Sequence, residues 1–328
     1  MHIDDEMLKE LLTEYGLEQP QIALLRHNEN ITYKVIDSVD GKAYLLRIHE
    51  PVTANIAGLQ HTYEGLSAEL QLLQDMSEKT ELIVRKPIIA RSGSMITAII
   101  QDDRRIYCSL LDWIEGRDAK KEDLSNEHIA RELGAQTAEL HQFLRSYTKV
   151  RAGERPSYGL ERSELILRQI SRGVDMGLFG QKEYAIIEES VQLINTRLAA
   201  TIHEPVSYGV IHADLNMSNI LITEQNKLAF IDFGLFGFGF YMLDVAMVAL
   251  NVPSAYRGFV LEGYFGEGHT PAHITVILEG FMLMAVLGYY AFQMENVKIH
   301  PWIRERMPLL CESRCQPLLR GESIFSSF

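Results

Sequence analysis

The stretch that most constrains this chain is residues 209–222, GVIHADLNMSNILI, together with AFIDFG at 229–234. The first stretch is apolar at both ends, which predicts burial, yet its middle carries His212, Asp214 and Asn219. Buried polar groups destabilise a fold unless they form hydrogen bonds. The sequence therefore predicts a loop whose polar side chains have specific partners or a ligand.

Residues 219–233, NILITEQNKLAFIDF, predict a β-hairpin, because two short apolar runs flank the polar turn EQN. Asp214 and Asn219 precede this hairpin and Asp232 follows it, so we expect the three side chains to converge where its ends meet. Carboxylate and amide oxygens are hard ligands of the kind that Mg²⁺ accepts when it also holds phosphates and waters. The alternative is that Asp214 caps a turn and Asn219 bonds local backbone.

The chain has 328 residues, of which 47% are hydrophobic, and a formal net charge of −13. This length favours two lobes or domains over a single compact core. The acidic balance argues against nucleic acid as a partner, since non-specific binding needs Lys and Arg to neutralise phosphates. It would suit a cationic ligand, although many ordinary proteins are acidic as well.

The three cysteines, an odd and small number, predict a reducing compartment, and we expect a cytoplasmic protein. A metal site at Cys311 and Cys315 is an alternative, but no further Cys/His pair lies near them in the sequence. The N-terminus lacks the basic and apolar regions of a signal peptide. The apolar run 274–292 contains Glu279 and lacks flanking basic residues, which favours a buried helix over a membrane span, so no membrane partner is expected.

The pattern along the chain changes near residue 117. Before it, ITYKVID and KAYLLRIH flank a turn with Asp40-Gly41, a helix is expected over 63–76, and extended segments return at ELIVRKPII, SMITAII and RRIYCSLLDWI. After it, helical periodicity dominates. We predict an α+β chain with a small antiparallel sheet and one main helix in residues 1–109, a hinge at 110–116, and a larger, mostly α-helical part at 117–328.

The spacing H-x-D-x-x-x-x-N followed by D-F-G resembles the core of the protein-kinase-like superfamily. More narrowly, IHADLNMSN, AFIDFG and YMLDVA resemble the aminoglycoside phosphotransferase/choline kinase family, and the resemblance runs from about residue 20 to at least 250. YLLRIHEP and HNENITY are somewhat similar to homoserine-kinase-type relatives. The resemblance implies a protein-kinase-like two-lobed fold, with ATP and Mg²⁺ as cofactors.

The resemblance also implies roles for the matched positions. Asp214 is expected to be the catalytic base, and Asn219 and Asp232 are expected to hold Mg²⁺. His212 is expected to fix the loop, with direct proton transfer as its alternative. Asp244 is expected to brace the catalytic loop, with ordinary helix capping as its alternative.

The matches are looser upstream. The nucleotide-covering loop falls at RHNENITYKV, which has no glycine, although Asn28 and Asn30 tolerate left-handed conformations; a plain hairpin is the alternative. Arg47 stands where kinases carry a strand lysine, and an arginine can form a bidentate pair with a phosphate. Its expected partner is Glu69, with Glu64 as the fallback, and a surface arginine is the alternative reading of Arg47.

The hinge falls at LLDWIEG, where backbone groups from Leu110 to Trp113, including those of Leu111, are expected to bond the adenine edge. Trp113 could instead belong to the core between the lobes.

Two features separate the chain from regulated protein kinases. Position 213 is Ala, where kinases controlled by activation-loop phosphorylation carry Arg, and only about ten residues separate Gly234 from Asp244. In addition, Asn216 replaces the lysine usual in protein serine/threonine kinases. A small-molecule kinase fits these features better.

The resulting hypothesis is an ATP- and Mg²⁺-dependent phosphotransferase acting on a hydroxyl of a small molecule such as an amino alcohol, homoserine, an aminoglycoside or a sugar. The alternatives are a kinase-like regulatory module that binds nucleotide without turnover, and an atypical bacterial protein Ser/Thr kinase. The sequence leaves open the acceptor, the choice between ATP and GTP, and the oligomeric state.

Overall fold

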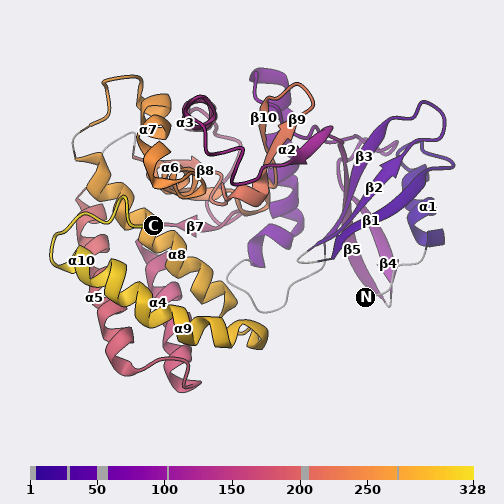
Figure 1. The fold of residues 1–328 in the computed structure, drawn as a ribbon. Helices are drawn as coiled ribbons and strands as arrows, with labels where there is room; N and C mark the ends of the chain where they lie inside the picture. The colour runs from indigo at the N-terminus through magenta and orange to yellow at the C-terminus, as the bar shows by residue number, and fades with distance from the viewer. Residues whose placement is uncertain (1–4, 28–29, 50–57, 102, 201–206, 272) are drawn as a thin grey trace. The chain divides into compact units, whose positions relative to one another are not determined.

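The computed structural model describes residues 5–27, 30–49, 58–101, 103–200, 207–271 and 273–328 (Figure 1). The chain divides into two compact units. Unit 1 consists of Met1–Arg117, Thr148–Pro156 and Leu221–Leu235, and unit 2 consists of Asp118–Tyr147, Ser157–Ile220 and Phe236–Phe328. The chain therefore leaves and re-enters unit 1 twice.

Unit 1 is built on a five-stranded antiparallel sheet in the order β1-β2-β3-β5-β4. The strands are β1 (Gln21–His27), β2 (Asn30–Ile36), β3 (Ala43–His49), β4 (Thr97–Gln101) and β5 (Arg104–Asp112). The expected turn between β2 and β3 is present, and Gly41 occupies its left-handed position with φ +73°. The predicted segment ELIVRKPII forms only an isolated bridge, between Pro87 and Leu111.

Two helices accompany this sheet, α1 (Asp5–Thr13) and α2 (Tyr63–Lys79), with a short 3₁₀ turn, η1 (Gly58–His61), before α2. Thr62 caps α2, since its side chain accepts the backbone N–H of Gly65. Leu8, Leu11 and Leu12 of α1 belong to the apolar cluster that includes strand residues of the sheet.

The predicted hairpin at 219–233 is confirmed. Strands β9 (Ile220–Thr223) and β10 (Leu228–Phe230) are neighbours in a three-stranded sheet completed by β6 (Gly116–Asp118). A tight turn joins β9 to β10, in which the Thr223 N–H donates to the Lys227 carbonyl at 2.9 Å.

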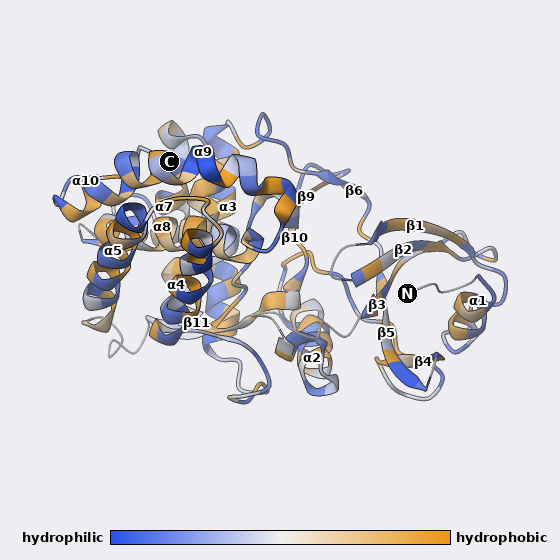
Figure 2. Cartoon of the chain, turned by 90° about the horizontal axis from the view of Figure 1, so that it is seen from below, coloured by the Kyte–Doolittle hydropathy of each residue, from blue (hydrophilic) through white to orange (hydrophobic). Residues whose placement is uncertain are grey.

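Unit 2 is mainly helical. Its helices are α3 (Glu127–Arg145), α4 (Leu160–Asp175), α5 (Gln181–Ala199), α6 (Tyr241–Asn251), α7 (Arg257–Phe265), α8 (Ile274–Gln293), α9 (His300–Leu310) and α10 (Gln316–Leu319). Figure 2 shows alternating hydrophilic and hydrophobic residues along α4 and α5, as expected for amphipathic helices on a core. A π-helical segment, Cys311–Cys315, joins α9 to α10.

Within the described residues, α8 is the one helix long and apolar enough to cross a membrane, and 61% of its most apolar window is buried. Its buried residues include Leu278, Phe281 and Leu287, which belong to the main core of unit 2. This packing agrees with the expectation of a core helix.

A small sheet in unit 2 was not predicted. Its order is β7-β11-β8, with β7 (Ser157–Tyr158), β8 (Tyr208–Ile211) and β11 (Gly237–Phe240). Strand β11 pairs antiparallel with β8 and parallel with β7. These strands have two to four residues each, too few for alternation to stand out in the sequence.

The predicted α+β class, with a small antiparallel sheet preceding a larger helical part, is confirmed. The predicted domain boundary, a hinge at 110–116 between two continuous parts of the chain, differs from the observed division in one respect. Unit 1 extends through Arg117 as a first stretch, but Thr148–Pro156 and Leu221–Leu235 also belong to it. Contacts between segments distant in sequence decide this, and a linear boundary cannot express them.

Candidate active site

The loop that follows β8 in unit 2 is held by one buried carboxylate. Asp244 of α6 accepts the backbone N–H of His212 through Oδ2 and that of Ala213 through Oδ1, both at 2.8 Å. Ala213 has φ +64°, a conformation that costs free energy for a residue other than glycine. The two bonds fix the strained turn before Asp214. This geometry agrees with the bracing role that is expected of Asp244.

A second layer fixes Asp244 itself. His141 of α3 is fully buried and lies with its Nε2 at 3.1 Å from Asp244 Oδ2 and its Nδ1 at 2.8 Å from the Tyr264 hydroxyl. Burial raises the pKa of Tyr264, so this phenol stays protonated. Three helices, α3, α6 and α7, therefore contribute to the position of one loop.

The carboxylate of Asp214 receives an amide N–H on each oxygen. Asn216 Nδ2 donates to Oδ1 at 2.8 Å, and Asn219 Nδ2 donates to Oδ2 at 2.7 Å and to the Asp214 carbonyl at 2.8 Å. Asn216 Oδ1 accepts the Ser218 N–H at 2.9 Å, which turns its Nδ2 toward Asp214. Hydrogen bonds of this kind stabilise a carboxylate in its ionised, acceptor-only form.

His212 is fully buried, and its Nδ1 accepts the Asp214 backbone N–H at 3.3 Å. A ring nitrogen engaged with the backbone of its own loop fits the expected fixing role better than proton transfer to a ligand.

Unit 1 contains the expected ion pair. Arg47 of β3 and Glu69 of α2 are joined by an Nη1–Oε1 contact of 2.5 Å, and both side chains are buried, 7% and 1% exposed. Burial opposes the charged form of Arg47, but the carboxylates of Glu69 and Asp232 outweigh it and its pKa is raised. Glu64, the fallback partner, is not needed.

Asp232 lies close to this pair. It has φ +63°, its Oδ1 accepts the Gly234 N–H at 3.4 Å, and a Cβ placed on Gly234 would lie 3.0 Å from Asp232 Oδ1 and 3.6 Å from Arg47 Nη2. Asp232 is exposed, unlike Arg47 and Glu69. Unit 1 thus gathers one exposed carboxylate beside a buried arginine.

Each unit contains a side-chain oxygen of a kind that can bind a divalent cation. Asn219 directs its amide nitrogen to Asp214, and within the described residues no hydrogen bond engages its Oδ1. An amide oxygen and an exposed carboxylate are ligands suited to Mg²⁺, which keeps waters and phosphates as its remaining ligands. In the part of the chain that the structure describes, no group of three or more His, Cys, Asp or Glu residues could hold a metal, so the alternative at Cys311 and Cys315 gains no support.

The hinge residues are partly engaged already. The Leu110 carbonyl accepts the Ile88 N–H at 2.8 Å, the Asp112 N–H donates to the Lys86 carbonyl at 2.8 Å, and the Trp113 N–H donates to the Ala43 carbonyl at 3.3 Å. The side chain of Leu111 is buried. Three backbone groups of residues 110–113 are therefore already hydrogen-bonded within the protein, and fewer remain that could bond the edge of an adenine.

Two cationic side chains lie near the Trp113 ring. Lys34 Nζ lies 4.3 Å and the Arg85 guanidinium carbon 5.2 Å from its ring centroid, and its Nε1 is buried without a hydrogen-bond partner in the described structure. Its role toward adenine stays a prediction.

The glycine-free loop joins β1 and β2. Asn28 lies outside the described residues. Asn30 begins β2 opposite His49 of β3, and its Oδ1 is buried without a hydrogen-bond partner among the described residues. Strand pairing on both sides agrees with a hairpin, and the nucleotide-covering role stays a prediction.

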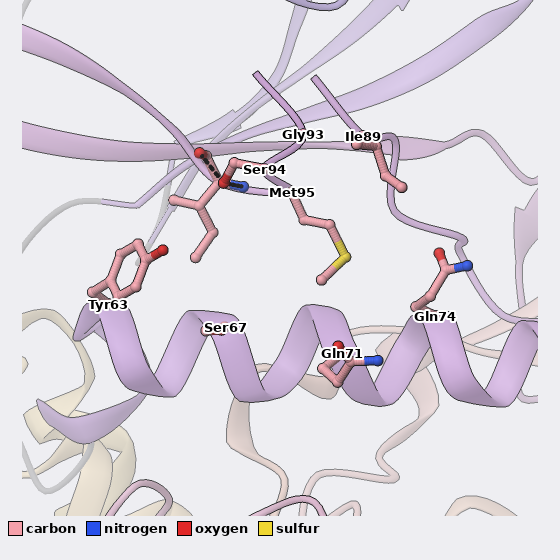
Figure 3. Close-up of a pocket in the computed structure, with 9 residues that line it drawn as sticks. Tyr63, Ser67, Gln71, Gln74, Ile89, Gly93, Ser94 and Met95 are labelled. Carbon is pink, nitrogen blue, oxygen red and sulfur yellow. Dashed lines mark hydrogen bonds between the residues drawn. The ribbon is translucent and has the colours of Figure 1, made fainter. Parts of the chain in front are cut away.

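A pocket of about 320 Å³ lies in unit 1 and is lined by none of the predicted residues (Figure 3). Tyr63, Ser67, Gln71 and Gln74 line it from one side of α2, facing the segment that contains Met95. At 100° per residue, Glu69 lies on the opposite side of this helix. The pocket is therefore separate from the Arg47–Glu69 pair.

Sequence reasoning missed the contacts of three residues: His141 with Asp244, Asn216 with Asp214, and Arg155 with the Gly65 and Phe233 carbonyls. His141 falls on the apolar face of a predicted helix, in AELHQFL, and a polar residue on such a face was the available signal. Arg155 lies in a polar connector without periodicity, where no pattern marks it.

Solved structures with the same fold cover almost the whole chain. The microcompartment-associated aminopropanol kinase is 22% identical, with a TM-score of 0.77, and the match covers 97% of this chain and 98% of that one. An amicoumacin kinase in complex with AMP-PNP and Ca²⁺ is 18% identical, with a TM-score of 0.72 and 93% of each chain covered. A choline kinase from Cryptosporidium parvum is 14% identical, with a TM-score of 0.68 and 97% of each chain covered.

These likenesses confirm the protein-kinase-like fold. A search of the curated proteins found no match. The model of the phosphotransferase enzyme family, in contrast, matches residues 21–275, which is well over half of the chain and includes the loop that carries Asp214, the D-F-G segment and the Arg47–Glu69 pair. The chain therefore belongs to the phosphotransferase enzyme family.

Proposed function

We propose that this phosphotransferase transfers the γ-phosphoryl group of ATP, with Mg²⁺, to a hydroxyl group of a small molecule. The observation that carries the proposal is the arrangement around Asp214. A strained turn fixed by Asp244 presents a carboxylate whose two oxygens are oriented by Asn216 and Asn219. A residue that only supported the fold would not need this many constraints on one partly exposed carboxylate.

In the proposed reaction, Asp214 accepts a hydrogen bond from the acceptor hydroxyl and orients its oxygen toward the γ-phosphorus. The new O–P bond forms as the bond to the β-phosphate oxygen breaks, ADP leaves, and the hydroxyl proton passes to Asp214. The protein contributes mainly position and charge, since phosphoryl transfer requires little covalent chemistry from it. The fixed loop supplies that position.

Asn219 and Asp232 would hold the metal, and Arg47, oriented by Glu69, would bind a phosphate. Mg²⁺, when bound, would neutralise charge on the phosphates. Support for one shared metal comes from the chain connection: Asn219 directly precedes β9, Asp232 follows β10 by two residues, and the two strands form one hairpin. An antiparallel hairpin has both its ends on the same side. Adenine would be bound near Leu111 and Trp113, and the phosphates covered by the loop with Asn28 and Asn30.

We propose an amino alcohol as the acceptor. Aminopropanol and choline kinases, named for cationic alcohols, share the fold over nearly the whole chain. A net charge of −13 would also raise the local concentration of a cationic substrate.

The three cysteines are free and buried, which supports a reducing, cytoplasmic location.

The test is ADP release measured against a panel of amino alcohols, homoserine, aminoglycosides and sugars. The wild-type chain should release ADP fastest with an amino alcohol and only when Mg²⁺ is present. Asp214→Ala should keep nucleotide binding and lose turnover by about 10²–10⁴-fold, the usual contribution of a general base. Asp232→Ala should lose the Mg²⁺-dependent part of the nucleotide-induced increase in Tm.

Asp175→Asn, an exposed change on α4, is the matched control and should leave both readouts unchanged. Unchanged turnover in Asp214→Ala would contradict the proposal. Mg²⁺-dependent binding without turnover on any acceptor would instead favour the regulatory module.

A further inference from the structure

Residues 148–156, which we call the strap, return to unit 1 and are attached to α2 at both ends. Lys149 Nζ contacts Asp75 at 2.9 Å (Oδ1) and 2.8 Å (Oδ2), and Arg155 Nη1 donates to the Gly65 carbonyl at 3.0 Å. Gly65 and Asp75 are separated by about 15 Å along the helix, at 1.5 Å per residue. The strap therefore contacts α2, a helix of 17 residues, at two points that are ten residues apart.

Arg155 makes a second set of contacts through its other terminal nitrogen, Nη2. Its Nη2 donates to the Phe233 carbonyl at 3.4 Å and to the Gly234 carbonyl. Phe233 and Gly234 directly follow Asp232, and Arg155 is 2% exposed. One buried side chain thus ties the first turn of α2, the helix whose second turn carries Glu69, to the segment that carries Asp232.

The planar guanidinium allows this arrangement. Its donors point along two edges at once, whereas a lysine ammonium is a point charge that cannot reach carbonyls on opposite sides with the same geometry. Arg155 is buried and does not face solvent. Its contacts act on the backbone that positions other groups.

We propose that Arg155 is a positioning residue that fixes Asp232 relative to the Arg47–Glu69 pair, so that the metal-binding and phosphate-binding groups of unit 1 are set before nucleotide binds. The inference rests on the proposed function, because it assigns Asp232 to the metal. It goes beyond that function by naming the device that orders unit 1 without a phosphorylated activation loop.

The test measures nucleotide affinity rather than turnover. Isothermal titration with a non-hydrolysable ATP analogue, with and without Mg²⁺, is run on the full chain, on Arg155→Met and on Arg155→Lys. Residues that orient a metal ligand typically contribute about 10–100-fold to metal affinity. Arg155→Met should therefore weaken binding of the Mg²⁺-nucleotide by about 10–100-fold and binding of the metal-free nucleotide much less. Arg155→Lys should recover part of the loss.

Lys149→Met is the matched control. It removes the other attachment of the strap, but Lys79 still contacts Asp75 at 2.7 Å. This variant should bind Mg²⁺-nucleotide as the wild type does. All titrations are performed well below the lowest Tm, and Arg155→Lys keeps the test decisive if Arg155→Met does not fold.

Equal Mg²⁺-nucleotide affinity in the wild type and the folded Arg155 variants would overturn the inference while leaving the proposed function standing. An equal loss in Lys149→Met would also overturn it, because the strap would then act only by stabilising α2. If the wild type binds Mg²⁺-nucleotide in an Arg155-dependent manner but phosphorylates no acceptor, the inference holds and the proposed function fails. If the wild type binds no Mg²⁺-nucleotide, both fail.

Discussion

At the scale of single residues, Asp244 fixes the backbone of the loop that carries Asp214. Its two oxygens accept two backbone N–H groups, and a neutral amide in its place keeps only one oxygen. We expect Asp244→Asn to leave one buried N–H without an acceptor, at a cost of about 1–3 kcal/mol. Urea denaturation should show this loss, and turnover should fall with it. Asp175→Asn, exposed on α4, should change the free energy of unfolding by no more than about 0.5 kcal/mol.

His49 of β3 gives a second prediction at this scale. It is buried, its Nε2 lies 3.0 Å from Ser109 Oγ, and burial, followed by the charges of Arg47 and His61, lowers its pKa well below 6.5. Below pH 6.5 the unfolded chain therefore binds more protons than the folded chain. The free energy of unfolding should fall as the pH drops from 7.5 to 5, by up to about 1.4 kcal/mol per pH unit for this residue.

Denaturant midpoints measured across this pH range check the prediction. His49→Gln should make the dependence shallower, leaving the part due to His61, whose pKa is also lowered, by burial and by Arg47. His128→Gln, at an exposed position on α3, should keep the wild-type slope. A slope unchanged in His49→Gln would show that His49 does not carry the effect.

At the scale of elements, α3 and α7 approach through two glycines. A Cβ on Gly134 would lie 2.0 Å from the Val260 carbonyl oxygen, and one on Gly263 would lie 2.0 Å from the Arg131 carbonyl oxygen. Gly134→Ala should therefore force the helices apart and destabilise the chain by about 1–3 kcal/mol, the usual cost of overpacking. Because these helices carry His141 and Tyr264, turnover should fall as well.

Gly258→Ala on α7 is the matched control. A Cβ there meets no atom within 4 Å, so the change should raise stability by about 0.5–1 kcal/mol through better helix propensity. Thermal unfolding followed by circular dichroism distinguishes the two variants. A Gly134→Ala variant as stable as the wild type would mean that the helix pair can separate at little cost.

At the scale of the whole molecule, the chain enters and leaves unit 1 repeatedly. A fragment of residues 1–117 lacks Lys149, Arg155 and the β9–β10 hairpin, which complete the unit. We expect this fragment to show no cooperative unfolding transition in urea, whereas the full chain unfolds cooperatively. A fragment with a sharp transition would show that the sheet and α2 are sufficient alone.

The sequence by itself determined the parts of this protein that depend on local pattern. The β9–β10 hairpin, α2, the core helix α8 and the H-x-D-x-x-x-x-N spacing follow from short-range periodicity, turn residues and motif spacing, and each could be placed to within a few residues. The Arg47–Glu69 pair was anticipated too, because the motif register fixed which strand and helix positions to compare.

Only the tertiary structure decided the partners of these elements. Asp244 is fixed by His141 from α3, Arg155 bonds both α2 and the D-F-G segment, and 148–156 belongs to unit 1. All three facts depend on contacts between residues that lie 74 to 103 positions apart in the sequence. A buried hydrogen bond depends on the distance between two groups in space, and a single sequence records only their order along the chain.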